Sequence, residues 1–198
     1  MATNLSAYFG KKKSRQFFNS IAAILSYVYL VFLILITGIA VFIDIANSHD
    51  YNRTVTGTVT KIIDGDTIHL TTPEQTRLKV RLYGIDAQES YYKKIEQPYG
   101  EESKKALSKK IMGKEIKLDI ITVDKYRRMV GIIWLGDRNI NLEMVREGHA
   151  EAFIEYLDEP YRAKFINAEK EAKVEKKGIW ALAEYERPTD FRKRMKVK

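Results

Sequence analysis

Three side chains that can act together on a phosphate ester stand within nine positions, at Arg81, Asp86 and Glu89. A guanidinium grips a phosphate through its planar fork. Carboxylates hold hard cations, and a carboxylate also accepts a proton from water. Their types and spacing therefore predict a site for cation-assisted chemistry on a phosphate group.

The residues around Arg81 predict how this cluster is positioned. Apolar residues alternate with Lys79 and Arg81 from Leu78 to Leu82, which is the period of a half-buried strand. Gly84 then allows the backbone to turn. We expect Arg81 to project from the strand and both carboxylates to lie on the loop that leaves it.

Composition narrows the classes of chemistry. The chain has 198 residues and no cysteine, which excludes disulfides, thiol catalysis and cysteine-ligated zinc. Lysine and arginine outnumber aspartate and glutamate by 34 to 26. A positive balance favours nucleic acid or an anionic membrane surface as partner, although many basic proteins bind neither.

The first 53 residues predict a membrane anchor. Residues 1–19 are polar and basic, and residues 20–43 carry no charged side chain. As a helix that span covers about 36 Å, against about 30 Å of bilayer core. The bases before it and the acids after it place the N-terminus in the cytoplasm and the rest of the chain in the periplasm or outside the cell. The alternative is a cleaved signal peptide, although the apolar run is longer than a signal core.

Residues 54–185 follow the linker at residues 44–53 and read as a compact domain of the α+β class, with residues 186–198 as a basic tail. The pattern predicts strands from Thr54 to Ile63, around Ile68 and Leu70, and over Arg77–Tyr83, Glu115–Val123 and Met129–Leu135, with helices over Pro98–Met112, Asn141–Glu147 and Pro160–Lys177. Five strands, with a helix between the third and fourth and about three helices in all, favour a Greek-key barrel of the oligonucleotide/oligosaccharide-binding (OB) fold.

Six short clusters in this order resemble one family. They are Asp64-Gly65-Asp66-Thr67, Val80-Arg81-Leu82 with Gly84 to Glu89, Gln97 to Glu102, Asp124 to Arg128, Asn141 to Ala150, and Gly178-Ile179-Trp180. In order and spacing they are similar to the staphylococcal nuclease (thermonuclease) family. The resemblance covers roughly Thr54 to Ala181 and omits the predicted anchor.

The resemblance implies a calcium-dependent phosphodiesterase that acts on DNA and RNA. By matching position, Asp66 and Asp86 are the calcium ligands, and Ala87 lends a backbone carbonyl. Glu89 matches the general base, and Arg81 and Arg128 match the two arginines on the phosphate. The remaining positions match a residue near the ion and the nucleotide pocket: Asp64, and Lys125, Tyr126 and Tyr156.

The sequence departs from the family pattern at two places. Gln88 stands where proline is usual, so a rigid φ restraint between Asp86 and Glu89 is missing. Arg127 and Met129 flank Arg128 where small residues, often glycine, are common. Neither departure removes a functional side chain.

Two other classes of function compete with the nuclease. The same barrel can hold nucleic acid without cutting it, as an OB-fold binding module. A structural envelope protein whose basic tail touches anionic lipid is the second. The expected partners are a nucleic-acid substrate and a lipid bilayer through residues 20–43, and no protein partner is inferred.

Overall fold

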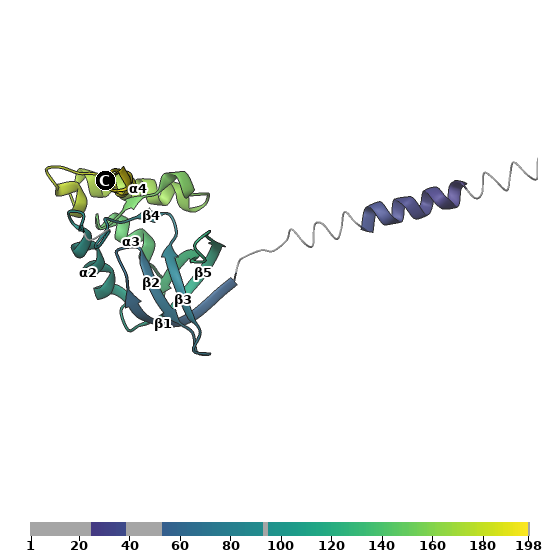
Figure 1. Ribbon diagram of the computed structural model, residues 1–198, viewed down its shortest axis with the longest axis horizontal. Coiled ribbons are helices and arrows are strands. Elements are labelled where there is room, and N and C mark those ends of the chain that lie inside the picture. The colour runs from purple at the N-terminus through teal and green to yellow at the C-terminus, as the bar shows by residue number, and fades with distance from the viewer. Residues whose placement is uncertain (1–24, 39–52, 93–94, 198) are drawn as a thin grey trace, which may run out of the picture. The chain divides into compact units, whose positions relative to one another are not determined.

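The computed structural model describes residues 25–38, 53–92 and 95–197 and falls into two units, Met1–Asp50 and Tyr51–Lys198 (Figure 1). In the first unit, residues 25–38 form an α-helix. No helix in these described segments is both long and apolar enough to cross a membrane. The predicted N-terminal segment 1–19, both ends of the predicted span 20–43 and nearly all of the linker 44–53 lie outside the described residues.

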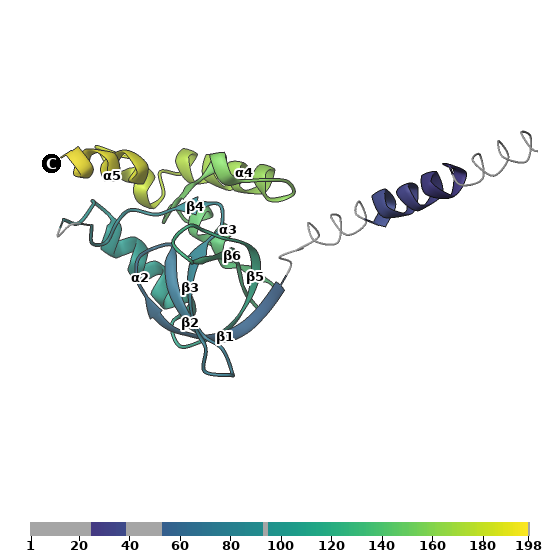
Figure 2. The ribbon, with the colours of Figure 1, turned by 45° about the vertical axis from the view of Figure 1, so that its right-hand side comes forward.

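The second unit is built on a closed barrel of five long strands (Figure 2). They are β1 (Arg53–Ile62), β2 (Thr67–Thr71), β3 (Arg77–Leu82), β5 (Glu115–Val123) and β6 (Met129–Leu135). Neighbours pair antiparallel in the order β3-β2-β1-β5-β6, with the short β7 (Arg138–Asn139) beside β6. A parallel pairing of β3 with β6 then closes the ring. The predicted OB-type barrel is confirmed.

The alternation of β3 sets which side chains fill the barrel. Val80 and Leu82 are buried, Lys79 is exposed, and Arg81 is only partly exposed. Gly84 follows with a φ of 74°, and a Cβ there would overlap the side chain of Leu157. Glycine therefore suits this turn both sterically and conformationally. The turn is followed directly by the short strand β4 (Ile85–Asp86), which pairs antiparallel with β8 (Glu151–Ala152).

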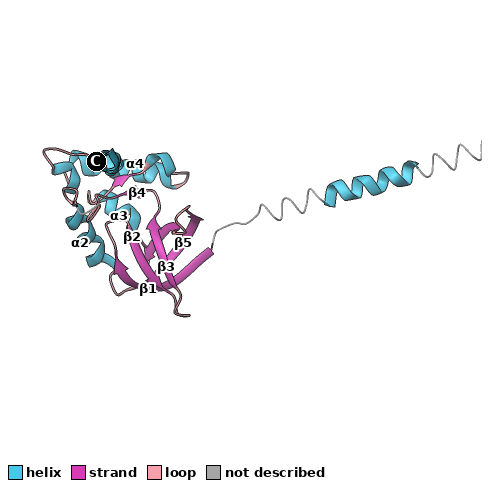
Figure 3. Cartoon of the chain, in the orientation of Figure 1, coloured by secondary structure: helices cyan, strands magenta, loops and turns pink. Residues whose placement is uncertain are grey.

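Helices lie along one side of the barrel and across one end of it (Figure 3). They are α2 (Gly100–Ile111), α3 (Ile140–Arg146), α4 (Tyr161–Val174) and α5 (Pro188–Val197), with short 3₁₀ turns η1 (Ile154–Tyr156) and η2 (Gly178–Ala181). The sequence predicts α2, α3 and α4 close to their observed bounds. In both ribbon views α4 and α5 lie at the end of the barrel where β4 is found (Figures 1 and 2).

The predicted basic tail at residues 186–198 is instead largely helical. Residues 188–197 form α5, and Phe191 and Met195 on it are buried. These two residues are four positions apart, so they line one face of the helix and can pack on the domain. Because lysines and arginines surround these two apolar residues, the sequence pattern did not indicate a packed helix. Residue 185 therefore does not mark the end of the folded unit.

Asn141 ties three parts of the barrel together from the first turn of α3. Its side-chain oxygen accepts a hydrogen bond from the Ile133 amide at 2.9 Å. Its nitrogen donates to the carbonyls of Tyr83, at 2.9 Å, and Gly131, at 3.0 Å. The residue is fully buried. One amide side chain thus links β6 to the turn that follows β3.

We expect Asn141→Ala to lower the free energy of unfolding by about 3 kcal/mol, because three buried hydrogen bonds to the backbone are lost. Urea denaturation measures the change. The matched control is Asn139→Ala, which removes the N-cap of the same helix and should cost about 1 kcal/mol. Equal losses in the two variants would contradict the bridging role of Asn141.

Candidate functional site

Arg81 joins two carboxylates that come from different strands. Its guanidinium forms an ion pair with Asp66, at the start of β2, and another with Asp86, on β4, at 2.8 Å. Thr67 lies opposite Arg81 in the β2–β3 register, which brings Asp66 to this point. Asp66 and Asp86 are buried at 5% and 0% exposure. The three side chains, which belong to two separate clusters of the sequence, therefore meet.

The carboxylate of Asp66 is held on several sides. The Thr67 hydroxyl donates to it at 2.9 Å and the Ala87 amide at 2.8 Å. Burial acts to raise the pKa of Asp66, but Arg81 and these hydrogen bonds outweigh it, and the pKa falls below its ordinary value. Asp64 accepts a hydrogen bond from the Asp66 amide at 3.0 Å, and burial together with the Asp66 charge raises its pKa well above normal. The surroundings thus favour ionisation of Asp66 over ionisation of Asp64.

Arg192, on α5, connects Asp86 to Glu89. Its Nη2 donates to Asp86 Oδ2 at 2.7 Å, and its Nη1 donates to Glu89 Oε1 at 2.7 Å. Burial raises the pKa of both Asp86 and Glu89, although Arg192 counteracts it at both and Arg81 counteracts it at Asp86. Glu89 therefore lies beside Asp86, as predicted, with an arginine between them.

Arg192 is a site residue that sequence reasoning missed. It is more than 100 positions from both of its partners, and the predicted basic tail gave no reason to single it out. The helical spacing of Phe191 and Met195 fits an apolar helix face, but it does not indicate which residues that helix contacts.

Arg128 directly precedes β6 and makes its own pairs. Met129 and Val130, the first residues of β6, are opposite Val80 and Arg81 of β3, so Arg128 lies next to the part of β6 that pairs with β3. Its Nε donates to Asp124 at 2.7 Å, and its guanidinium lies 5.5 Å from the centre of the Tyr126 ring. Asp124 thus holds Arg128 within its own hairpin.

The remaining predicted positions are on exposed surface. Tyr126 is 67% exposed, with Lys125 Nζ 5.2 Å from its ring centre. Tyr156, on η1, is 65% exposed and packs on Phe153 with ring centres 4.6 Å apart. No contact of the described residues joins these side chains to Arg81 or Asp86. These side chains are therefore outside the buried cluster.

Both departures from the family pattern have structural counterparts. Gln88 is 1% exposed, and its two amide atoms have no hydrogen-bond partner among the described residues. Arg127 has a φ of 62°, in the left-handed region that favours glycine. The backbone therefore keeps a conformation suited to glycine while carrying an arginine.

The donor atoms around Asp66 and Asp86 suit a hard cation. No group of three or more histidine, aspartate or glutamate side chains within residues 25–38, 53–92 and 95–197 is arranged to hold a metal ion. Two carboxylates remain, and both are already balanced by guanidiniums in a buried setting. Carboxylate oxygens are the donors that a hard divalent cation such as calcium prefers, and the backbone and water can supply further ligands. A cation at this point would compete with the guanidiniums for the same oxygens.

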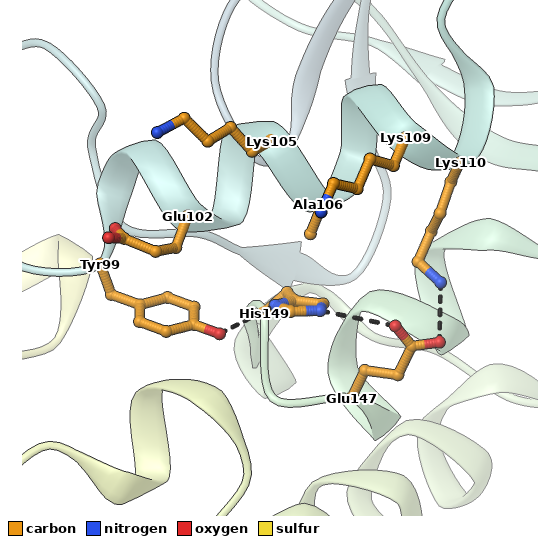
Figure 4. A pocket seen from close by; sticks show the side chains of 8 residues that line it. All are labelled: Tyr99, Glu102, Lys105, Ala106, Lys109, Lys110, Glu147 and His149. Atoms are coloured by element: carbon orange, nitrogen blue, oxygen red, sulfur yellow. Dashed lines mark hydrogen bonds and ion pairs between the residues drawn. The ribbon is translucent and has the colours of Figure 1, made fainter.

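A separate hollow of about 330 Å³ lies along α2 and contains none of this cluster (Figure 4). It is lined by Tyr99, Glu102, Lys105, Ala106, Lys109, Lys110, Glu147 and His149. His149 stacks on Tyr99 and forms a 3.1 Å hydrogen bond with its hydroxyl. Its other ring nitrogen is 3.5 Å from Glu147. The hollow therefore contains a partly buried histidine and is separate from the cluster of Asp66, Arg81 and Asp86.

We expect this histidine to make stability depend on pH. Burial lowers the pKa of His149, with Lys110 adding to the effect and Glu147 opposing it. Below its ordinary value of 6.5, the unfolded chain binds a proton that the folded chain does not. The free energy of unfolding should thus fall as pH drops through 6.5, and less so in His149→Gln. Urea titrations at pH 7.5 and 5.5 measure this, and Glu147→Gln should steepen the fall.

Comparison with known proteins agrees with this geometry. A family model described as staphylococcal nuclease homologue matches residues 79–182. An uncharacterized endonuclease of Haemophilus influenzae is 34% identical over 70% of this chain and 74% of its own length. The thermonuclease of Staphylococcus intermedius is 34% identical over 62% of this chain and 74% of its own length. A probable staphylococcal-like nuclease of rice is 37% identical over 59% of this chain but only 29% of its own length.

The matched region contains Arg81, Asp86, Glu89 and Arg128. In the structure Arg81 pairs with Asp86, and Arg192 links Asp86 to Glu89. The chain therefore belongs to the staphylococcal nuclease family and is a hydrolase that cleaves phosphodiester bonds.

Proposed function

We propose that the enzyme is a calcium-dependent endonuclease that cuts both DNA and RNA. The observation that supports this most strongly is the bridge from Asp66 through Arg81 to Asp86, with Glu89 beside it. Cation ligands, a phosphate-binding guanidinium and a proton acceptor are thus within reach of one phosphodiester.

Asp66 and Asp86 would hold the cation, with the Ala87 carbonyl as a further oxygen ligand. Calcium accepts six to eight oxygen ligands in flexible geometry, so water completes the set. When bound, such an ion polarises the phosphodiester and neutralises part of its charge. Asp66 is already ionised because its pKa is lowered, which prepares it for this role.

Glu89 acts as the general base. Its carboxylate takes a proton from water as the water oxygen attacks phosphorus, and the bond from phosphorus to the leaving oxygen breaks. Negative charge gathers on the phosphoryl oxygens during this step. Arg81 and Arg128 stabilise that charge more strongly than the charge of the ground state, which is what accelerates the reaction. Lysine would serve less well because it lacks the planar fork.

The exposed aromatic side chains would allow the enzyme to use both nucleic acids. Tyr126 and Tyr156 offer ring faces on which any base can stack, and Lys125 adds a positive charge beside them. Stacking is tolerant of sequence and does not require a 2′-hydroxyl. The same site can therefore accept a flexible single strand of either nucleic acid.

A calcium titration of the digestion of single-stranded DNA and RNA tests the proposal. We expect no products in the presence of a chelator and products of both substrates as calcium is added. Digestion that ignores the chelator would refute the calcium dependence. Retention of the strand without cutting, at every calcium concentration, would support a binding module instead.

We also propose that residues 20–43 anchor the enzyme in a membrane, with the catalytic domain outside the cytoplasm. The absence of charge in this span supports the proposal. So do the apolar side chains exposed on the helix of residues 25–38, such as Leu30 at 55% and Phe32 at 58%.

Alkaline carbonate extraction of membranes from expressing cells tests the anchor. An anchored protein stays in the membrane pellet, and protease added to the outer side digests the catalytic domain. Release of the full-length chain into the supernatant would refute the anchor. An intact mass that lacks the first residues would identify a cleaved signal peptide.

A further inference from the structure

Helix α5 is fastened to the loops that carry the two carboxylates. Phe191 is 2% exposed and packs edge-on against Tyr92, with ring centres 6.4 Å apart. The buried side chain of Gln97 donates to the Glu186 carbonyl at 2.8 Å and accepts from the Glu89 amide at 3.1 Å. One amide thus connects the segment before α5 directly to the backbone of Glu89.

A second fastening reaches the strand of Asp86. The hydroxyl of Tyr185 and the guanidinium of Arg187 both bind Glu151, the latter at 2.9 Å. Glu151 is 3% exposed and lies opposite Asp86 in the β4–β8 register. The segment that leads into α5 is therefore held next to both Asp86 and Glu89, and α5 is part of the site.

Arg192 uses this placement to occupy the carboxylates. Besides its two 2.7 Å contacts, Nη1 lies 3.2 Å from Asp86 Oδ1. Asp86 Oδ1 also accepts from Arg81 at 2.8 Å. Both oxygens of Asp86 thus face guanidinium groups. Arg194, two positions along the same helix, instead pairs with Glu186 on the surface.

A divalent ion and a guanidinium cannot both take the same side of Asp86. Each needs the carboxylate oxygens at close range, and two positive charges a few ångströms apart repel each other strongly in a buried setting. Arg192 is also the better candidate to yield, because 26% of its side chain is exposed whereas only 12% of that of Arg81 is. Its guanidinium can move toward solvent without unfolding the barrel.

We propose that Arg192 is a built-in counter-cation of Asp86 and Glu89, which the divalent ion must displace from Asp86. This inference rests on the cation site of the proposed function. In the metal-free enzyme Arg192 offsets the charge of the buried Asp86 and holds the partly buried Glu89 in an ion pair. Cation binding then releases Glu89 as a proton acceptor at the same time as it fills the site. Helix α5 thereby sets the cation affinity of the nuclease.

Isothermal titration of calcium into the full chain in detergent, without nucleic acid, tests this directly. Arg192→Gln should bind calcium at least about ten-fold more tightly than the wild type, because a competing unit charge is removed. The matched control Arg194→Gln should stay within about two-fold. An affinity of Arg192→Gln that is unchanged or weaker overturns the proposal, as does the absence of calcium binding in all three proteins.

Two more variants separate competition from a loss of structure. Arg192→Lys keeps the charge but not the fork, so its affinity should lie between those of the wild type and Arg192→Gln. Phe191→Ala loosens α5 while keeping Arg192, and it should also tighten calcium binding. Weaker binding in Phe191→Ala, with the barrel still folded by circular dichroism, would count against the proposal. Tighter calcium binding without cleavage would refute the proposed function alone.

Discussion

Glu89→Gln is expected to slow phosphodiester cleavage by about 10²- to 10⁴-fold, the usual contribution of a general base. Glutamine has nearly the same shape but cannot accept the proton of the attacking water. Substrate binding should change little, because the proton acceptor acts in the transition state. Steady-state digestion of a fluorescent oligonucleotide separates kcat from KM.

Glu96→Gln is the matched control, because Glu96 lies exposed on the same loop and has no part in the cluster. Its cleavage rate should equal that of the wild type. A Glu89→Gln enzyme that is folded and cleaves at the wild-type rate would remove Glu89 from the mechanism. A rise in KM at constant kcat would make Glu89 a binding residue instead.

Arg81→Met is expected to lower the free energy of unfolding by about 3–5 kcal/mol in the presence of a chelator, because it leaves buried acids without their main partner. Asp86 and Asp66 are at most 5% exposed, and Arg81 contacts both. Urea denaturation measures the loss. The same variant should lose nearly all cleavage, since a phosphate-binding fork is gone.

Calcium should return part of that stability. A ligand present at 100 times its dissociation constant adds about 2.7 kcal/mol if it binds the folded state alone. Arg128→Met is the control: its partner Asp124 is on a partly exposed hairpin, so the expected loss is only about 0–1 kcal/mol. A small loss in Arg81→Met, or no recovery with calcium, would contradict the shared role of Asp66 and Asp86. Arg81→Lys keeps the charge and tests cleavage with less cost in stability.

The barrel could be predicted because its information is local. Alternation from Leu78 to Leu82, the turn at Gly84 and the helix after Pro98 each depend on neighbouring residues, and all three are found in the structure. The cluster of Asp66, Arg81 and Asp86 could be predicted because the family resemblance supplied contacts between distant segments. The order and spacing of the matching clusters supplied information that otherwise comes only from the fold.

Arg192 could not be predicted by either route. Its contacts with Asp86 and Glu89 span more than 100 residues, and the resemblance ends near Ala181. The sequence around it is dominated by bases, which are typical of a solvated tail. The burial of Phe191 depends on Tyr92 and the domain surface, so it becomes visible only when the fold is known.

Closure of the barrel by β3 and β6 has a consequence for how the enzyme matures. The parallel pairing brings the strand of Arg81 beside that of Arg128, and it joins segments about 50 residues apart in the chain. Such distant pairings are slow to form because the long connecting loop has to be ordered first. During refolding, helical signals should thus return before the two arginines are aligned. Nuclease competence would be one of the last properties the chain acquires.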